Sequence, residues 1–208
     1  MEYKKEIITV DKDILDYFKV VYFGTNPDRL EAAVFRAYRD FNRTLRLGAL
    51  DSNERSELRK QVTIILKEEI SKLNDDKHMT QDRFDAWHRQ TCDMIKRPYE
   101  SSEIVFSYGQ AQKWLNMTFK YLYILGYYSF DSVFGFCHIP IDKYVFQIAK
   151  KEFGIPIPTE SWSNWTDYDG QYMDYQKKLR FRIKDYEPLR WELKYWISEA
   201  RLFENKNN

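Results

Sequence analysis

The chain has 208 residues, of which 43% are hydrophobic and 17% are aromatic, and its 33 basic residues nearly balance its 32 acidic ones. A chain of this length predicts one domain that buries enough surface to fold without a disulfide or a structural metal. The many aromatic residues and the near-zero net charge exclude an intrinsically disordered protein. With only 7 glycines and 6 prolines, the composition favours long helices that pack through aromatic side chains.

The sequence contains none of the usual marks of a membrane protein or a metalloprotein. Its N-terminal stretch, MEYKKEIITVDKD, is charged and has no apolar signal-peptide core, and no apolar run is long enough to span a bilayer. We therefore expect a soluble, cytoplasmic protein with no membrane partner. Cys92 and Cys137 lack the paired spacing of zinc or iron–sulfur ligands, so we expect no metal site and no cofactor.

Capping and breaking residues divide the chain into about eight helices and predict an all-α fold. In the first half, Asp11 or Asp13 can cap the first helix, and Asn26 with Pro27 can begin the second, which ends before Gly48. The four helices expected in this half cover about residues 14–23, 28–45, 53–73 and 80–97.

The stretch RPYESS, residues 97–102, is the clearest predicted loop of the chain. We therefore expect a compact domain of two helical lobes, residues 1–97 and 98–208. In the second lobe the most apolar segment, WLNMTFKYLYIL, predicts a central helix that Gly126 ends. Asp142 directly precedes KYVFQIAKKEF, which repeats apolar residues at helical spacing.

Two more helices are expected near the C-terminus, at about 171–184 and 187–203. Within the first, basic residues alternate with Leu179, Phe181 and Ile183, so KKLRFRIK also fits a strand, although a helix is favoured.

The segment from Lys177 to Lys184 contains five basic residues and no acidic one. It predicts either a solvated helix face or a patch in which Lys178, Arg180 and Arg182 contact phosphate groups.

Two short segments constrain the chemistry most: GQAQK at 109–113, where the apolar helix starts, and HIPID at 138–142. A glycine-containing turn that leads into a helix leaves backbone N–H groups unpaired, and the helix dipole there favours an anion such as phosphate. Lys113 lies in that first turn beside Trp114, and a lysine buried against aromatic rings can have the lowered pKa that an amine nucleophile needs. Asp142 is also a suitable N-cap for the helix that follows it.

GQAQK resembles the G-x-G-x-K hairpin of helix-hairpin-helix DNA glycosylases, and IPID with KYVFQIAKKEF resembles the V-P-V-D segment and following helix of the 8-oxoguanine glycosylase branch. The resemblance covers about residues 102–154. It implies a helix-hairpin-helix element in which the amides of Gly109 and Ala111 hold a DNA phosphate. It also implies that Lys113 attacks C1′ of a damaged nucleotide and that Asp142 assists cleavage of the N-glycosidic bond.

Three tryptophans are candidates for stacking on an extruded base: Trp114, Trp162 and Trp165. Each also has a structural interpretation, since aromatic clusters commonly pack over a core. The same choice applies to the two catalytic candidates. Lys113 can be an ordinary surface lysine, and Asp142 can serve only as a helix cap.

Three functional hypotheses follow. The first is a DNA-binding base-excision glycosylase and lyase that acts through a Schiff base on Lys113 and through Asp142. The second is a non-catalytic helical protein that binds a protein or nucleic-acid partner through its aromatic and basic C-terminal surface. The third is a hydrolase in which His138 and Asp142 form an acid–base pair. The sequence specifies neither a lesion nor an oligomeric state.

Overall fold

The computed structural model describes residues 11–74, 78–127, 132–184 and 186–207. Within these ranges the chain is helical and contains no strand, which confirms the all-α fold. The α-helices are α1 (Lys12–Phe23), α2 (Arg29–Phe41), α3 (Ser52–Asn74), α4 (Gln81–Glu100), α5 (Tyr108–Leu125), α6 (Lys143–Phe153), α7 (Asp174–Ile183) and α8 (Pro188–Asn207). Short helical turns between them are η1 (Asn42–Thr44), η2 (Phe134–Phe136), η3 (Trp162–Asn164) and η4 (Tyr168–Met173). The start of the N-terminal stretch and parts of two predicted connections, at 75–77 and 128–131, lie outside the described residues.

Side-chain caps begin several helices at the positions expected from the sequence. Asp11 caps α1, Thr80 caps α4 and Asp142 caps α6. In α2 the cap is Asp28 rather than Asn26, because the Asp28 carboxylate accepts hydrogen bonds from two backbone N–H groups of the first turn. The cap at Asp142 fixes where α6 starts and therefore where this carboxylate lies.

The boundary after α4 differs from the prediction. The helix continues through Pro98 to Glu100, so most of RPYESS is helical, and Ser101 donates a backbone hydrogen bond to the Arg97 carbonyl at 2.9 Å. Proline removes one helical N–H donor, but this loss is tolerated close to the end of a helix, where the packing of Tyr99 fixes the last turn. The connection between α4 and α5 is therefore residues 101–107.

One continuous cluster of buried apolar side chains, from Leu30 to Trp191, spans both predicted lobes. At its centre, Tyr38 and Phe41 of α2 pack against Trp114 of α5, with ring centroids 5.0 and 5.4 Å apart. The indole N–H of Trp114 donates to a backbone carbonyl of α2 at 3.0 Å. The helices on the two sides of residue 97 thus share a core.

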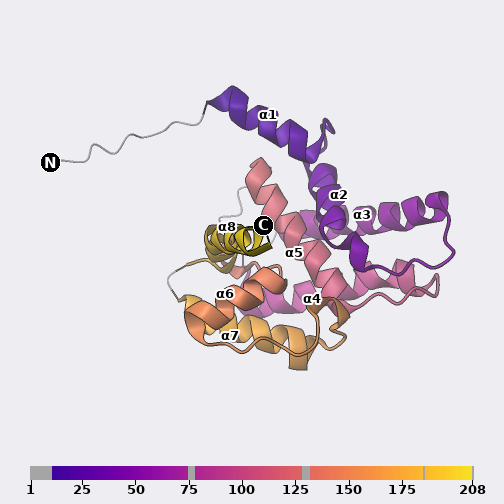
Figure 1. Cartoon of the computed structure of the whole chain (residues 1–208). Coiled ribbons are helices and arrows are strands. Elements are labelled where there is room, and N and C mark those ends of the chain that lie inside the picture. The colour runs from indigo at the N-terminus through magenta and orange to yellow at the C-terminus, as the bar shows by residue number, and fades with distance from the viewer. Residues whose placement is uncertain (1–10, 75–77, 128–131, 185, 208) are drawn as a thin grey trace.

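Helix α5 runs through the middle of the molecule and is buried along almost its whole length (Figure 1). Helix α2 packs along it, α4 packs on it from another side, and η3 covers its first turn, while α6 packs on α8. Because α5 is buried along almost its whole length, the polar side chains that it carries must find partners within the protein, most of them on other elements.

Helix α1 stands away from the other helices in Figure 1 and buries none of its residues. Its last turn is attached through Tyr22, whose hydroxyl lies 3.0 Å from the Tyr121 hydroxyl and accepts a hydrogen bond from Arg36. No helix within the described ranges combines the length and apolar content needed to cross a membrane.

The start of α5 depends on a glycine at 109. A Cβ placed there would overlap the backbone carbonyl of Trp162 in η3, whereas a Cβ at Gly135 would meet nothing within 4 Å. We predict that Gly109→Ala lowers the free energy of unfolding by at least about 2–3 kcal/mol, because the backbone of η3 must move. Urea denaturation measures this loss. Gly135→Ala is the matched control and should change stability by less than about 1 kcal/mol; equal effects of both substitutions would contradict the prediction.

Candidate active site

The structure brings Lys113 and Asp142 together at the base of a pocket. Lys113 Nζ lies 2.8 Å from Asp142 Oδ2 and also donates to the Pro140 carbonyl at 3.3 Å. The side chains are only 6% and 14% exposed, yet both line the pocket. Lys113 is therefore not the ordinary surface lysine that the sequence allowed.

The local fold explains why the two groups meet. Asp142 Oδ1 accepts the N–H groups of Tyr144 and Val145, at 2.9 and 3.0 Å, and so caps α6. The other oxygen, Oδ2, faces α5 and also accepts the indole N–H of Trp196 from α8 at 3.3 Å. One carboxylate thus caps a helix and holds the lysine, using a different oxygen for each.

Electrostatics keep the Asp142 carboxylate ionised. Burial by itself would raise its pKa, but the nearby Lys113 charge, the hydrogen bond from Lys113, the cap N–H of Val145 and the Trp196 indole together hold the pKa below its usual range. At neutral pH Asp142 is accordingly a carboxylate, and its Oδ2 is in direct contact with the side-chain nitrogen of Lys113.

The pocket above this pair has a volume of about 610 Å³, within the range typical of small-molecule sites. Its walls come from α1, α2, α5, α6, η3 and α8. The aromatic lining residues are Tyr22, Tyr121, Tyr144, Trp162 and Trp196, and the basic ones are Arg36, Arg39, Arg43, Lys113, Lys120 and Lys143. Aromatic faces combined with cations suit a ligand that has both a planar ring and a negative charge.

A second buried ion pair lies two helical turns further along α5. Lys120 Nζ is 2.9 Å from Glu192 Oε1 of α8, and the Glu192 side chain is fully buried. Burial raises the pKa of Glu192, although the Lys120 charge opposes this shift. The second oxygen of Glu192, Oε2, has no hydrogen-bond partner among the described residues. Lys120 also lies 5.1 Å from the ring centre of Trp196, and both residues line the pocket together with Lys113 and Asp142, whereas Glu192 lies behind this wall.

Three arginines that line this pocket were not among the site residues predicted from the sequence. Arg36, Arg39 and Arg43 follow one another at intervals of three and four, which places them on one face of α2 and its continuation in η1. That spacing was visible in the sequence, but only the fold shows that this face borders Lys113. Trp196 likewise reaches Asp142 from 54 residues away.

The predicted phosphate-binding hairpin does not form as expected. Gly109 and Ala111 lie inside the first turns of α5, and their N–H groups donate to the carbonyls of Trp165 at 2.9 Å and Ser107 at 3.1 Å. Ser107 and Gln110 form a reciprocal capping box, whose Ser-x-x-Gln signature is present in the sequence. Because these donors are already bonded within the protein, Gly109 and Ala111 offer no free amide to a phosphate.

The three stacking candidates separate into two groups. Trp114 and Trp165 are core residues: Trp114 packs between α2 and α5, and Trp165 packs against Phe146 and Tyr175. Only Trp162 lines the pocket, with its ring centre 5.8 Å from Lys113 Nζ.

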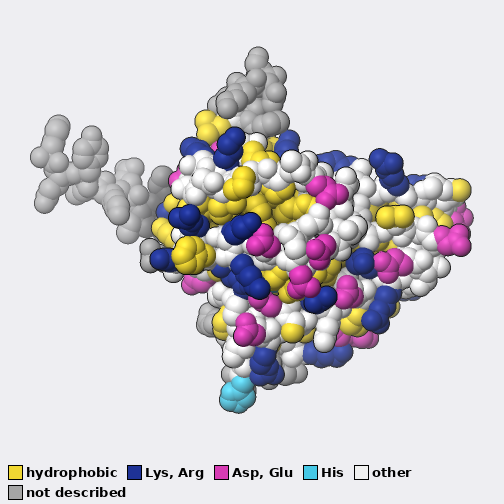
Figure 2. Space-filling model, turned by 90° about the horizontal axis from the view of Figure 1, so that it is seen from below, with side chains coloured by type: hydrophobic (Ala, Val, Ile, Leu, Met, Phe, Trp, Pro, Cys, Tyr) yellow, Lys and Arg dark blue, Asp and Glu magenta, His cyan; other side chains and the backbone are white. Residues whose placement is uncertain are grey.

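The basic segment 177–184 is helical, within and just beyond α7, and does not line this pocket. Arg180 turns inward and binds both oxygens of Asp85 at 2.8 and 2.9 Å. Lys178 pairs with Asp174 at 2.6 Å on the surface, and Arg182 is exposed. Acidic and basic side chains are interspersed on the face that Figure 2 shows, on the α7 side of the molecule. The predicted phosphate patch of Lys178, Arg180 and Arg182 is therefore not a single surface.

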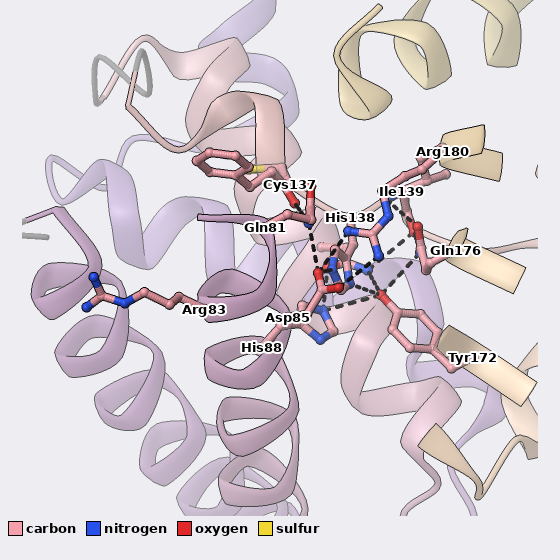
Figure 3. Close-up of polar contacts among 12 residues, drawn as sticks. Gln81, Arg83, Asp85, His88, Cys137, His138, Ile139, Tyr172, Gln176 and Arg180 are labelled. Carbon is pink, nitrogen blue, oxygen red and sulfur yellow. Dashed lines mark hydrogen bonds and ion pairs between the residues drawn. The ribbon is translucent and has the colours of Figure 1, made fainter. Parts of the chain in front are cut away.

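A separate polar network fills the interior between α4, α5 and α7 (Figure 3). Both ring nitrogens of His138 form hydrogen bonds, one with the Asp85 carboxylate at 2.8 Å and the other with the Tyr172 hydroxyl at 2.9 Å. His88 lies 4.2 Å from it, ring centre to ring centre, and bonds Asn116 at 2.9 Å. Both nitrogens of His138 are thus used, so the predicted acid–base pair of His138 and Asp142 does not form. Among the described residues, no group of three His, Cys, Asp or Glu side chains is placed to hold a metal ion.

Comparisons of the chain with protein-family models, with curated proteins and with solved structures find no match. The resemblance to helix-hairpin-helix glycosylases therefore remains a proposal that depends on the residues of the site.

The buried histidines predict a loss of stability in acid. Burial lowers the pKa of both His88 and His138, although the Asp85 carboxylate opposes this shift at His138. As pH falls below about 6.5, the unfolded chain takes up protons that the folded state does not, so each histidine reduces the free energy of unfolding by up to about 1.4 kcal/mol per pH unit. The pKa of Asp85 is also lowered, which extends the loss below pH 4. Urea denaturation between pH 8 and 5 measures the slope, and stability that increases toward pH 5 would contradict it.

The second ion pair gives a double-mutant test. Lys120→Met leaves the Glu192 carboxylate buried without a cation and should reduce the free energy of unfolding by about 3–5 kcal/mol at pH 7. The double variant Lys120→Met/Glu192→Leu should recover most of that loss. Because the folded-state pKa of Glu192 is raised further without Lys120, the single variant should regain stability as pH decreases toward 5. A single variant that unfolds like the wild type at pH 7 would refute this account.

Proposed function

We propose that the protein excises a base from DNA, with Lys113 as the amine nucleophile and Asp142 as the carboxylate that orients the amine and stabilises the positive charge developing at C1′. The observation that supports this most strongly is the 2.8 Å contact between Lys113 Nζ and Asp142 Oδ2 at the base of a pocket of about 610 Å³. The segments GQAQK and HIPID predict these two residues as a catalytic pair, and they lie 29 residues apart in the chain.

The proposed reaction conserves protons within the site. Lys113 gives one proton to the departing base and attacks C1′ of an extruded nucleotide as the N-glycosidic bond breaks, while the ionised Asp142 stabilises the positive charge that develops at C1′. The bonding electrons leave with the base, which the proton from Lys113 neutralises. One of the remaining protons on nitrogen moves to O4′ as the sugar ring opens, which leaves a protonated Schiff base on Lys113. Borohydride reduces this iminium to a stable amine.

The surroundings of the pair suit an extruded nucleotide. The Trp162 ring lies beside Lys113, and Trp196 and Tyr144, which also line the pocket, pack edge to face with ring centres 5.1 Å apart. Aromatic walls of this kind hold a base by stacking without requiring a particular sequence. The basic lining residues complement the charge of the DNA backbone.

The trapping experiment uses duplexes that carry an abasic site, 8-oxoguanine, uracil, hypoxanthine or an alkylated base, incubated with the full-length protein and borohydride. We expect a covalent adduct with at least one substrate, and mass spectrometry of the digested adduct should locate it at Lys113. Lys113→Gln should abolish the adduct. Asp142→Asn should slow its formation by about 100-fold or more, although asparagine caps helices as well as aspartate does. Lys60→Gln, on the exposed face of α3, is the control.

An adduct at another lysine, or the absence of both adduct and base release for every substrate, would refute the proposal. DNA binding without turnover would then favour the non-catalytic alternative. Thermal unfolding of the Asp142→Asn variant checks that lost reactivity does not reflect lost folding.

A further inference from the structure

We propose that Arg39 and Arg43, at the rim of the pocket, bind two phosphates of the DNA strand that carries the extruded nucleotide. This inference rests on the proposed function and assigns the backbone contacts to a surface that the sequence did not indicate. These arginines replace the amides of Gly109 and Ala111, which are bonded within the protein.

The geometry of α2 supports this assignment. Its buried side, which includes Ala33, Ala37 and Phe41, packs toward α5, so the intervening arginines are directed to the pocket and to solvent. Arg39 and Arg43 are four residues apart, a spacing that brings side chains side by side, with Cβ atoms about 5–6 Å apart on a helix. Two guanidinium groups at this spacing can engage successive phosphates of one strand.

Arg39 and Arg43 are available to a ligand, whereas the neighbouring basic residues already have partners within the protein. Arg36 lies 3.4 Å from Asp40 and is stacked on Tyr22, Lys113 is held by Asp142 and Lys120 by Glu192. Arg39 and Arg43 are exposed, and neither forms an ion pair with a carboxylate in the part of the chain that the structure describes. Guanidinium groups are well suited to bidentate phosphate binding.

Local charge also favours a polyanion here. Six residues that line the pocket are basic and two are acidic, and Glu192 behind the wall adds one carboxylate. The chain as a whole has a formal net charge of only +1. The positive excess is thus concentrated around the pocket, where it can attract DNA although the total charge is balanced.

A second hollow adjoins the first pocket along the surface, and its own acidic lining residue is Glu160. It has a volume of about 420 Å³ and shares Arg43, Lys143 and Trp162 with the first pocket. These residues therefore stand between two adjoining depressions. A strand that places one nucleotide in the first can continue over Arg43 into the second, which gives Arg43 a phosphate next to the extruded residue.

The test measures binding separately from chemistry. Fluorescence anisotropy follows a labelled duplex with a central tetrahydrofuran site, which has no base to lose and no aldehyde to form a Schiff base. At about 100 mM salt, Arg39→Gln/Arg43→Gln should bind about 10- to 100-fold more weakly, and the slope of log affinity against log salt should decrease by about 1.8. Arg39→Lys/Arg43→Lys should retain most of the affinity. Arg46→Gln/Lys60→Gln, an equal loss of exposed charge away from the pocket, should bind like the wild type.

Wild-type affinity in the Arg39/Arg43 double variant, or an equal loss in the control, would overturn the inference. So would a lowered melting temperature without weaker binding, since that outcome limits the two arginines to stabilising the C-terminal end of α2. The proposed function fails independently, when the wild type binds the duplex but traps no substrate. If trapping succeeds while the double variant binds normally, only the arginine assignment is wrong.

Discussion

A helix that is buried on all sides must satisfy every polar group it carries, and this constraint on α5 organises the whole molecule. Each side chain that cannot be left unpaired in the interior fixes a neighbouring element: Lys113 is held by the cap of α6, Lys120 by Glu192 of α8, Asn116 by His88 of α4 and Gln110 by Thr44 of η1. An unpaired charge in such a position costs several kcal/mol. The polar residues of α5 therefore determine how the other helices are arranged around it.

The same helix separates two polar regions with different properties. On one face, Gln112 and Asn116 belong to the interior network, in which their side chains and those of His88, His138 and Tyr172 are buried. On the adjacent face, Lys113 and Lys120 reach the wall of an open pocket. The interior network can contribute specificity of packing and sensitivity to acid, whereas only the open face can meet a substrate. This difference in access, more than the chemistry of the side chains, directs the functional proposal to Lys113 and Asp142.

The near-zero net charge of the chain does not reveal that basic residues are concentrated around the pocket. Acidic residues neutralise the basic ones over the chain, but several of them are used internally: Asp85 holds Arg180, and Glu192 holds Lys120. The rim of the pocket retains arginines outside such pairs. A near-neutral protein can thus present a local basic surface, which the proposed contact with DNA requires.

The sequence by itself determined the all-α fold, the central helix, most helix boundaries and the two residues at the base of the pocket. These features depend on local signals: caps such as Asp142, left-handed glycines such as Gly126, and apolar spacing along a helix. Other features could not be predicted. Whether Trp114 faces the core or a ligand, whether Arg180 points outward, and which arginines surround Lys113 all depend on contacts between residues far apart in the chain. Tertiary structure decided them, because burial and pairing are properties of facing elements and cannot be read from one segment alone.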